Sequence, residues 1–476
     1  MKDWMKELSF HYSSMKKLYP EDDLLIIFDI DGTIIDLRFM MLYVLQAYDR
    51  NHKTRYFRHL TISDIDTHER EISRLLDRID IPDSERKEIL KWYEEWGWSK
   101  KTIFAAHRPY HGVLEVIRWF QIQPRTYVGL NTGRPESLRE VTINSLNNLA
   151  EEFRIKFTND LLFMNKEVGW ELKVPDSKVR GLEYFQNAGY RVFAMVDNEP
   201  ANLDAIDKVD KKNEILLLHA DTLFESKRQQ TPKHAVSGQF YDVTELIQEK
   251  DLPKHIQFVW HGVGDEISLH QYFNTNIRWA EVYIRRDPFT NEPIVRHADF
   301  DKWPLQEKEE ILPFETVMKQ FVKYNRSIKC DIKEGGELVE KVLETTSKYK
   351  IEDDRLWFGG NVERIEEKGF NLFSETHPNA IIQCRIDFIT PLLVSIPEKT
   401  KEILDLFTHW GINRFSINDD TPHKSKILDQ MDKWGFDVNI FNINDLEAFL
   451  QAVVLQPCSI TSNFDFPKWT TNMQGK

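Results

Sequence analysis

Two patterns of apolar positions alternate along the chain. Short runs of consecutive apolar residues, such as Leu24-Leu25-Ile26-Ile27-Phe28, are typical of strands buried on both faces of a parallel sheet. Between these runs, apolar residues recur every three or four positions, which predicts amphipathic helices. In the first half of the chain the predicted strands cover residues 24–28, 126–130, 191–196 and 215–218. This alternation predicts an α/β protein with a Rossmann-like parallel sheet.

Residues 37–110 interrupt the alternation with helical patterns alone. Apolar residues recur at helical spacing in 72–79 and again in 89–96, and Pro82 separates the two stretches. We therefore predict a helical insert after the first strand, within a domain whose core comprises residues 1–36 and 111–250. The tryptophans and the tyrosine of 92–98 are interpreted as helix packing and not as a ligand platform.

The second half, residues 255–470, again alternates strands and helices. Candidate strands cover 257–260, 280–284, 294–297, 327–332, 356–358, 380–384, 392–395, 414–417, 438–441 and 458–461. Helical patterns lie between several of them, notably in 337–349, 399–410, 424–434 and 445–453. Roughly eight strand–helix steps predict a (β/α)₈ barrel, whose functional residues lie at the carboxyl ends of its strands.

Composition and charge restrict the classes of partner. The chain has 476 residues, of which 41% are hydrophobic, so two or three domains with sizeable cores are expected. Its formal net charge of −14 disfavours nucleic-acid binding, which requires clustered Lys and Arg. Small phosphorylated metabolites remain compatible partners, because their sites need only local positive charge.

The cysteines and the N-terminal sequence indicate the compartment. Only Cys330, Cys384 and Cys458 occur, far apart and odd in number, which predicts no disulfide framework. The first twenty residues carry charges throughout, unlike a signal peptide, and no apolar run is long enough to span a membrane. We expect a cytoplasmic protein without a membrane span. Nothing in the sequence defines an oligomeric state.

Polar residues follow the predicted strands of the first half. Asp29 and Asp31 come directly after the first strand and precede Gly32, although Asp-Gly is also common in ordinary turns. Thr132 follows the second strand, where it could donate to a phosphoryl oxygen or cap the next helix. A lysine, Lys178, opens a later helix, where only a nearby anion would favour it, and Asp197 ends a further strand.

These motifs, in this order, resemble the haloacid dehalogenase superfamily of phosphohydrolases with a helical cap inserted after the first strand. The resemblance covers residues 21–220 and implies that Asp29 is the nucleophile and Asp31 the general acid and base. It further implies phosphoryl binding by Thr132, Gly133, Arg134 and Lys178. An Asp at position 31 favours a phosphatase over a dehalogenase.

The same resemblance implies a Mg²⁺ cofactor. Its ligands would be Asp29, the backbone carbonyl of Asp31, and Asp197, all hard oxygen donors of the kind that Mg²⁺ prefers. One departure concerns the residue after Asp197, where the superfamily often has a second acid and this chain has Asn198. Glu199 is a candidate outer partner in its place.

The second half resembles the glycerophosphodiesterase and menorin-like branches of the phospholipase-C-like phosphodiesterases. The resemblance rests on Trp260-His261-Gly262, Glu281-Val282-Tyr283, His297 and Asp331-Ile332-Lys333. It implies that His261 and His297 act as acid and base. It also implies that Glu281 and Asp331 hold a second divalent cation and that Lys333 binds substrate.

This second motif set is damaged, which leaves several functions open. Tyr283 stands where a metal-binding Asp is expected, and Gly262 stands where an Arg normally follows the first His. The barrel could cleave a diester whose monoester product the first domain hydrolyses. It could instead bind a phosphorylated ligand or a partner without turnover. A third alternative is that the first domain transfers its phosphoryl group to an acceptor other than water.

Overall fold

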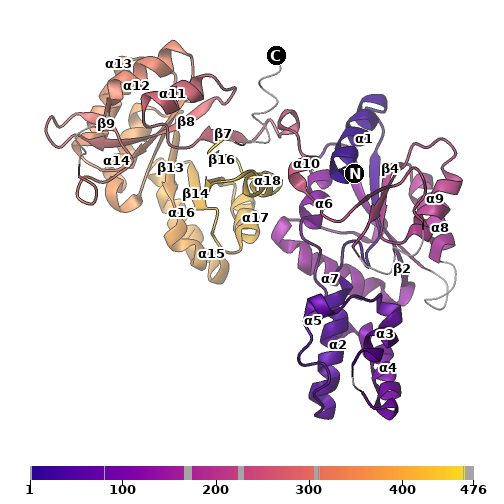
Figure 1. The fold of residues 1–476 in the computed structure, drawn as a ribbon. Coiled ribbons are helices and arrows are strands. Elements are labelled where there is room, and N and C mark those ends of the chain that lie inside the picture. Colours follow the sequence, from indigo (N-terminus) through magenta and orange to yellow (C-terminus); the bar gives the residue numbers. More distant parts are fainter. Residues whose placement is uncertain are drawn as a thin grey trace. The chain divides into compact units, whose positions relative to one another are not determined.

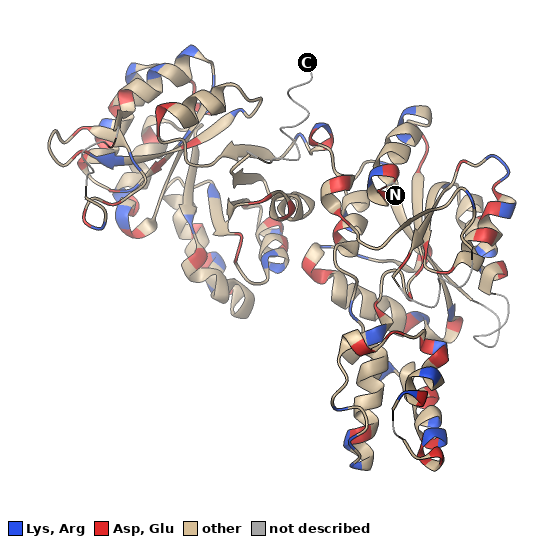
Figure 2. Ribbon diagram, viewed as in Figure 1, with Lys and Arg blue, Asp and Glu red and all other residues tan. Residues whose placement is uncertain are grey.

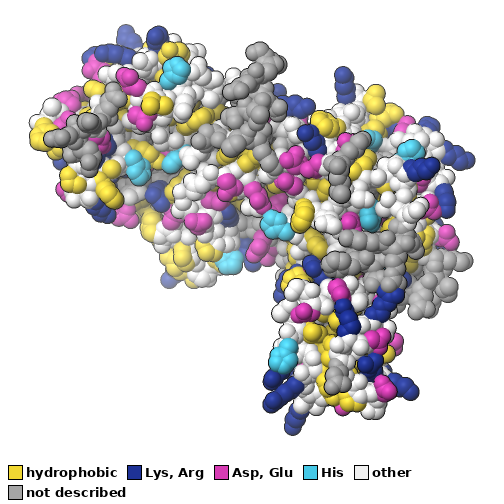
Figure 3. Space-filling view, viewed as in Figure 1, with side chains coloured by type: hydrophobic (Ala, Val, Ile, Leu, Met, Phe, Trp, Pro, Cys, Tyr) yellow, Lys and Arg dark blue, Asp and Glu magenta, His cyan; other side chains and the backbone are white. Residues whose placement is uncertain are grey.

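The chain folds into two compact units, residues 1–248 and 249–476 (Figure 1). The computed structural model describes residues 3–79, 81–165, 174–222, 230–304, 309, 311–464 and 466. Within these ranges no helix is both long and apolar enough to cross a membrane. On the face drawn in Figure 3, basic and acidic side chains are interspersed over both units.

Unit 1 is built on a six-stranded parallel sheet with the order β3-β2-β1-β4-β5-β6. Its strands are β1 (Leu24–Phe28), β2 (Thr126–Pro135), β3 (Leu162–Asn165), β4 (Arg191–Asp197), β5 (Leu216–Ala220) and β6 (Val236–Gly238). All five residues of β1 are buried, as its continuous apolar run predicts. The parallel sheet of this half confirms the predicted fold class. The sequence prediction missed β3, whose four residues are too few to give a pattern.

Helices cover both faces of the sheet (Figure 1). They are α1 (Trp4–Leu18), α6 (Val113–Gln121), α7 (Arg139–Ala150), α8 (Val174–Asn187), α9 (Pro200–Val209) and α10 (Val243–Leu246). Leu182 and Phe185 of α8 pack with Leu203 of α9 against Leu25 and Ile27. On the other face, Tyr12 of α1 lies edge-on to Phe120 of α6, with ring centroids 5.2 Å apart. Because successive strand residues point to opposite faces, the uninterrupted apolar run of β1 serves both layers.

The segment between β1 and α6 forms a helical cap, which Figure 1 shows projecting from one end of the sheet. Its helices are α2 (Leu37–His52), α3 (Ile72–Asp77), α4 (Asp83–Gly97) and α5 (Lys100–Ala106). Acidic and basic residues follow one another along their exposed sides (Figure 2). The Trp92 indole donates to the Val44 carbonyl at 3.1 Å and stacks on Trp96, so these aromatic residues pack α4 against α2.

Unit 2 is a closed barrel of eight parallel strands, which confirms the predicted (β/α)₈ architecture. The strands are β7 (Gln257–Trp260), β8 (Trp279–Arg286), β11 (Ser327–Ile332), β12 (Leu356–Gly360), β13 (Ile381–Arg385), β14 (Arg414–Asn418), β15 (Asp437–Ile443) and β16 (Ser459–Ser462). The helices between them are α11 (Glu266–Phe273), α12 (Phe314–Lys323), α13 (Glu337–Lys348), α14 (Val362–Thr376), α15 (Thr390–Ser395), α16 (Pro397–His409), α17 (Lys424–Trp434) and α18 (Leu446–Val454).

Two predicted strands of unit 2 are corrected by the structure. Residues 392–395 belong to helix α15, in which Leu393 is buried whereas Leu392 and Val394 are exposed. A four-residue apolar run does not separate helix from strand, and the Pro391 at the start of this segment favours a helix N-terminus. Residues 293–295 do form a strand, β9 (Pro293–Val295), but it pairs antiparallel with β8 outside the barrel, as does β10 (Leu312–Pro313) with β9. His297 therefore follows a hairpin and does not end a barrel strand.

Candidate functional site

Asp29 lies at the carboxyl end of β1, the central strand of unit 1. Its backbone N–H donates to the Val196 carbonyl of β4 at 2.9 Å, which continues the parallel ladder one residue beyond the strand. Gly32 then adopts a φ of +80°, a conformation that L side chains rarely adopt, and turns the chain toward the cap. The Asp29 side chain is thereby held at the edge of the sheet where open α/β folds place their ligands, with 5% of its surface exposed.

Lys178 of α8 brings two of these carboxylates together. Its buried ammonium contacts Asp29 Oδ1 and lies 2.9 Å from Asp197 Oδ2, although the three residues are far apart in sequence. Asn131 fixes the lysine backbone, because its Nδ2 donates to the Lys178 carbonyl at 2.8 Å. This close approach of β2 and α8 requires Gly181, where an added Cβ would collide with the Asn131 side chain. Lys178 thus joins the predicted nucleophile and the predicted metal ligand.

Asp197 is fully buried and held by its own loop. The Asn202 amide donates to Oδ1 at 3.0 Å and to Oδ2 at 3.1 Å, and the Glu199 backbone N–H donates to Oδ1 at 2.9 Å. Asn198 accepts a hydrogen bond from the Thr33 hydroxyl at 3.4 Å, so the position of the missing second acid ties two loops of the site together. The Glu199 carboxylate instead pairs with His68 of the cap at 3.0 Å.

Asp31 faces Arg134, which the resemblance had assigned to phosphoryl binding. The guanidinium donates to both oxygens of the Asp31 carboxylate, at 2.8 and 2.6 Å, and its side chain is completely buried. Thr142 accepts a third bond at 3.1 Å, and the guanidinium lies 5.1 Å from the ring centroid of Trp98 in the cap. A bidentate pair of this kind stabilises the ionised carboxylate and fixes its orientation.

Thr132 and Gly133 complete the loop after β2. The buried Thr132 hydroxyl accepts from the Arg134 backbone N–H at 3.1 Å, so it stabilises this loop and not the start of α7 at Arg139. The hydroxyl still has its own proton to donate to a ligand. At Gly133 an added Cβ would lie 3.1 Å from Val174 of α8, a tight contact between the loop and that helix.

Negative charge is in excess at this site. The three carboxylates of Asp29, Asp31 and Asp197 face two cations, Lys178 and Arg134. Burial raises the pKa of Asp29 to about 7, because repulsion by Asp197 and Asp31 adds to it while attraction to Lys178 opposes it. Burial alone would lower the pKa of Lys178, yet Asp197 and Asp29 raise it, so the ammonium stays charged.

This charge balance and donor chemistry fit a hard divalent cation. The available donors are the carboxylates of Asp29 and Asp197 and the backbone carbonyl of Asp31, with water completing an octahedral shell. Two side chains and one carbonyl differ from a cluster of three ligating side chains, and no such cluster occurs in the described part of the chain. A dication would relieve the repulsion that raises the pKa of Asp29.

In unit 2 the residues predicted for catalysis bond to one another. His261 Nδ1 lies 3.0 Å from Asn463 Oδ1, and its Nε2 lies 2.7 Å from the Tyr283 hydroxyl. With Nδ1 donating to the amide oxygen, Nε2 accepts from the phenol, so both ring nitrogens are engaged. His297 contacts the same phenol ring edge-on, with centroids 4.5 Å apart. Burial and the nearby Lys333 lower the pKa of His297.

The two carboxylates of unit 2 each have their own lysine. Lys329 Nζ lies 2.9 Å from Glu281 Oε1 with both side chains buried, and Lys333 Nζ lies 2.6 Å from Asp331 Oδ2. Burial would raise the pKa of Glu281, but Lys329 outweighs this effect and lowers it. Sequence analysis missed Lys329, although its place two residues before Asp331 on one strand puts both on the same face of β11.

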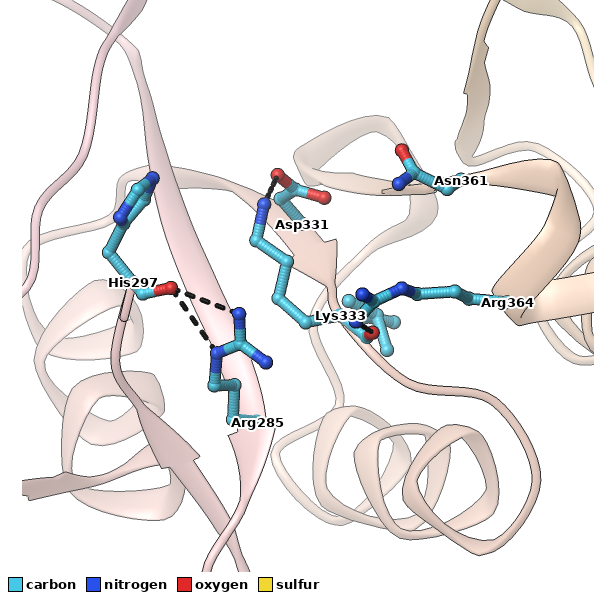
Figure 4. A pocket seen from close by; sticks show the side chains of 7 residues that line it. Arg285, His297, Asp331, Lys333, Asn361 and Arg364 are labelled. Carbon is cyan, nitrogen blue, oxygen red and sulfur yellow. Dashed lines mark hydrogen bonds and ion pairs between the residues drawn. The ribbon is translucent and has the colours of Figure 1, made fainter. Parts of the chain in front are cut away.

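A cavity of about 180 Å³ opens beside Lys333. Figure 4 shows its lining side chains, which come from β8, the hairpin, the end of β11 and the start of α14. They are Arg285, His297, Asp331, Ile332, Lys333, Asn361 and Arg364. Neither arginine was predicted from the sequence, because each is an isolated basic residue that only the barrel brings to the cavity.

Comparisons with known proteins give likenesses in structure alone, since no protein-family model and no curated protein matches the chain. One similar structure is a phosphodiesterase from Oleispira antarctica in complex with the product sn-glycerol-3-phosphate (15% identity, 48% of this chain and 98% of that chain, TM-score 0.36). Another is a glycerophosphodiester phosphodiesterase from Parabacteroides distasonis (14% identity, 46% and 96%, TM-score 0.35). A third, from Clostridium difficile, is described as a phosphatase (15% identity, 42% and 85%, TM-score 0.30). Each covers less than half of this chain, and function therefore rests on the side chains described above.

Proposed function

We propose that unit 1 is a Mg²⁺-dependent phosphohydrolase that acts on a small phosphate monoester through an aspartyl-phosphate on Asp29. The observation that carries the proposal is the convergence of Asp29, Lys178 and Asp197 at one buried point. An unpaired buried carboxylate costs several kcal/mol, so a cluster with excess negative charge is retained where charge is needed for chemistry.

The first chemical step would be attack by an Asp29 carboxylate oxygen on phosphorus. The bond between phosphorus and the ester oxygen breaks, and Asp31 gives that oxygen a proton. Lys178 and the Thr132 hydroxyl would hold the transferring phosphoryl oxygens. Bound Mg²⁺ would supply positive charge that lets one anion approach another.

In the second step water would attack the phosphorus of the aspartyl-phosphate. Asp31 takes the water proton, inorganic phosphate leaves, and the Asp29 carboxylate is restored. The bidentate bond from Arg134 holds Asp31 in the ionised form that this step requires. The same pair must open when Asp31 takes up the proton that it delivers in the first step.

The test is phosphate release from a panel of phosphate monoesters with Mg²⁺, comparing wild type with Asp29→Asn. We expect release by wild type and a loss of about 10³-fold or more in the variant, the scale seen when a catalytic nucleophile is removed. Asp22→Asn is the matched control, because Asp22 precedes β1 and pairs with Arg191 at the partly exposed end of the sheet. Release from none of the esters by wild type, or equal rates in both proteins, would contradict the proposal.

A further inference from the structure

The cavity of unit 2 is positively charged. Arg285, Lys333 and Arg364 contribute three cations and Asp331 a single carboxylate to its lining. The arginines are only partly used by the protein: Arg285 donates to the His297 carbonyl from Nε at 3.2 Å and Nη2 at 3.1 Å, and Arg364 donates to the Lys333 carbonyl at 2.9 Å. Each guanidinium carries five N–H donors, so each retains donors for a ligand.

The size of this cavity suits a phosphate group. Its volume of about 180 Å³ exceeds several-fold the roughly 30 Å³ that a water molecule occupies. Planar guanidinium groups bind phosphate oxygens in pairs, and Lys333 supplies a point charge. In Figure 4 the guanidiniums of Arg285 and Arg364 approach the lysine from opposite sides.

The residues that would hold a divalent cation in unit 2 do not fit one. Lys329 lies directly opposite Glu281 in the ladder between β11 and β8, and Asp331 lies opposite Tyr283. Each carboxylate is already neutralised by one ammonium, at 2.9 Å for Glu281 and 2.6 Å for Asp331. A dication would have to displace a buried ammonium and then face Arg285 and Arg364, which is unfavourable by Coulomb repulsion. Unit 1 differs because a single ammonium there is shared by two carboxylates.

We propose that the barrel binds a phosphate oxyanion in this cavity without a divalent cation and without cleaving phosphodiesters. Lys329 takes the charge-neutralising place of the metal, and the Tyr283 hydroxyl occupies the His261 nitrogen that would otherwise move a proton. The binding groups are the two guanidiniums and Lys333. This inference is independent of the activity proposed for unit 1.

Hydrogen–deuterium exchange of the full chain tests this proposal, because it reports on the two units separately. Inorganic phosphate is added in EDTA and again with Ca²⁺, and Ca²⁺ is added alone. We expect phosphate to protect residues 283–297 and 331–364 equally in EDTA and with Ca²⁺. Ca²⁺ alone is expected to leave 279–286 and 327–333 unchanged. Protection that appears only with Ca²⁺, protection by Ca²⁺ alone, or no effect of phosphate on unit 2 would each overturn the proposal.

Two variants assign the binding to the cavity. Arg364→Gln removes one guanidinium, and Lys368→Gln is its control on the same helix, because Lys368 is exposed and contacts only Glu340 at 4.0 Å among the printed ion pairs. Asn361→Asp adds a negative charge while keeping a good N-cap residue for α14, so it guards against a folding defect in the first variant. We expect about tenfold weaker phosphate protection in Arg364→Gln and in Asn361→Asp and none in the control. Unchanged protection in both cavity variants would contradict the assignment.

Discussion

Lys178 and Lys329 are both buried lysines that face carboxylates, yet they create different sites. The Lys178 ammonium is shared between Asp29 and Asp197, and the unneutralised charge raises the pKa of Asp29 to about 7. Lys329 serves Glu281, while Lys333 serves Asp331. The ratio of carboxylates to cations therefore favours a dication in unit 1 and an anion in unit 2.

The raised pKa of Asp29 predicts a pH-dependent metal affinity. Below pH 7 the carboxyl is protonated, and a proton must leave before the group can ligate Mg²⁺. We expect the Mg²⁺ affinity in calorimetry to fall about tenfold per unit as the pH drops below about 6 and to level off above 7. Asp29→Asn should bind Mg²⁺ more weakly and with little pH dependence. An affinity that does not change between pH 5.5 and 8 would refute this prediction.

Arg134 is a positioning residue for Asp31. Lysine cannot reproduce its two parallel hydrogen bonds, so Arg134→Lys should lower kcat about 10- to 100-fold while KM changes little. Arg139→Lys provides the control, because Arg139 makes a similar two-oxygen pair with Glu136 at the surface. Steady-state kinetics distinguish the two. A normal kcat in Arg134→Lys, or an equal loss in Arg139→Lys, would show that this pair does not orient the acid and base.

At the scale of elements, the cap is joined to the metal-binding loop by a single histidine pair. Burial would lower the pKa of His68, but its bonds to Glu199 and Glu69 outweigh this effect and raise it to about 10. Because the folded-state pKa exceeds the unfolded value of 6.5, the pair stabilises fully below pH 6.5 and its contribution declines as the pH rises toward 10.

We therefore expect His68→Gln to lower the Tm of unit 1 most at pH 6 and progressively less as the pH rises to 9. Thermal unfolding followed by circular dichroism measures this difference. His59→Gln is the control, since His59 is an exposed cap residue beside Arg58. A Tm difference that stays constant with pH, or grows, would mean that the pair is not charged in the folded protein.

Long apolar runs and polar residues at strand ends were readable from the sequence, whereas pairings across the fold were not. The run at 24–28 defined β1 and placed Asp29 and Asp31 after it, because a strand buried on both faces leaves a simple pattern. Residues 392–395 were assigned wrongly, because one-sided burial in a short helix gives the same letters as a strand. The contacts of Arg134 with Asp31 depend on tertiary packing that local sequence does not encode.

At the scale of the whole molecule, the two units combine one candidate catalytic site with one anion-binding cavity. The chain should therefore release phosphate from monoesters and none from glycerophosphodiesters, even with added Mg²⁺ or Ca²⁺. A sensitive assay would follow alcohol release from the diester in wild type and His261→Ala. Diester cleavage that His261→Ala abolishes would show that the hydrogen bond from Tyr283 does not silence the barrel.

Mass spectrometry of the acid-quenched enzyme during turnover of p-nitrophenyl phosphate with Mg²⁺ is the most direct test of the proposed chemistry. The account predicts a phosphoryl group on Asp29, the carboxylate that Lys178 holds at the end of β1. The modification should be absent in EDTA and in Asp29→Asn. Phosphate release with Asp29 unmodified, at a rate that Asp29→Asn leaves unchanged, would contradict the account.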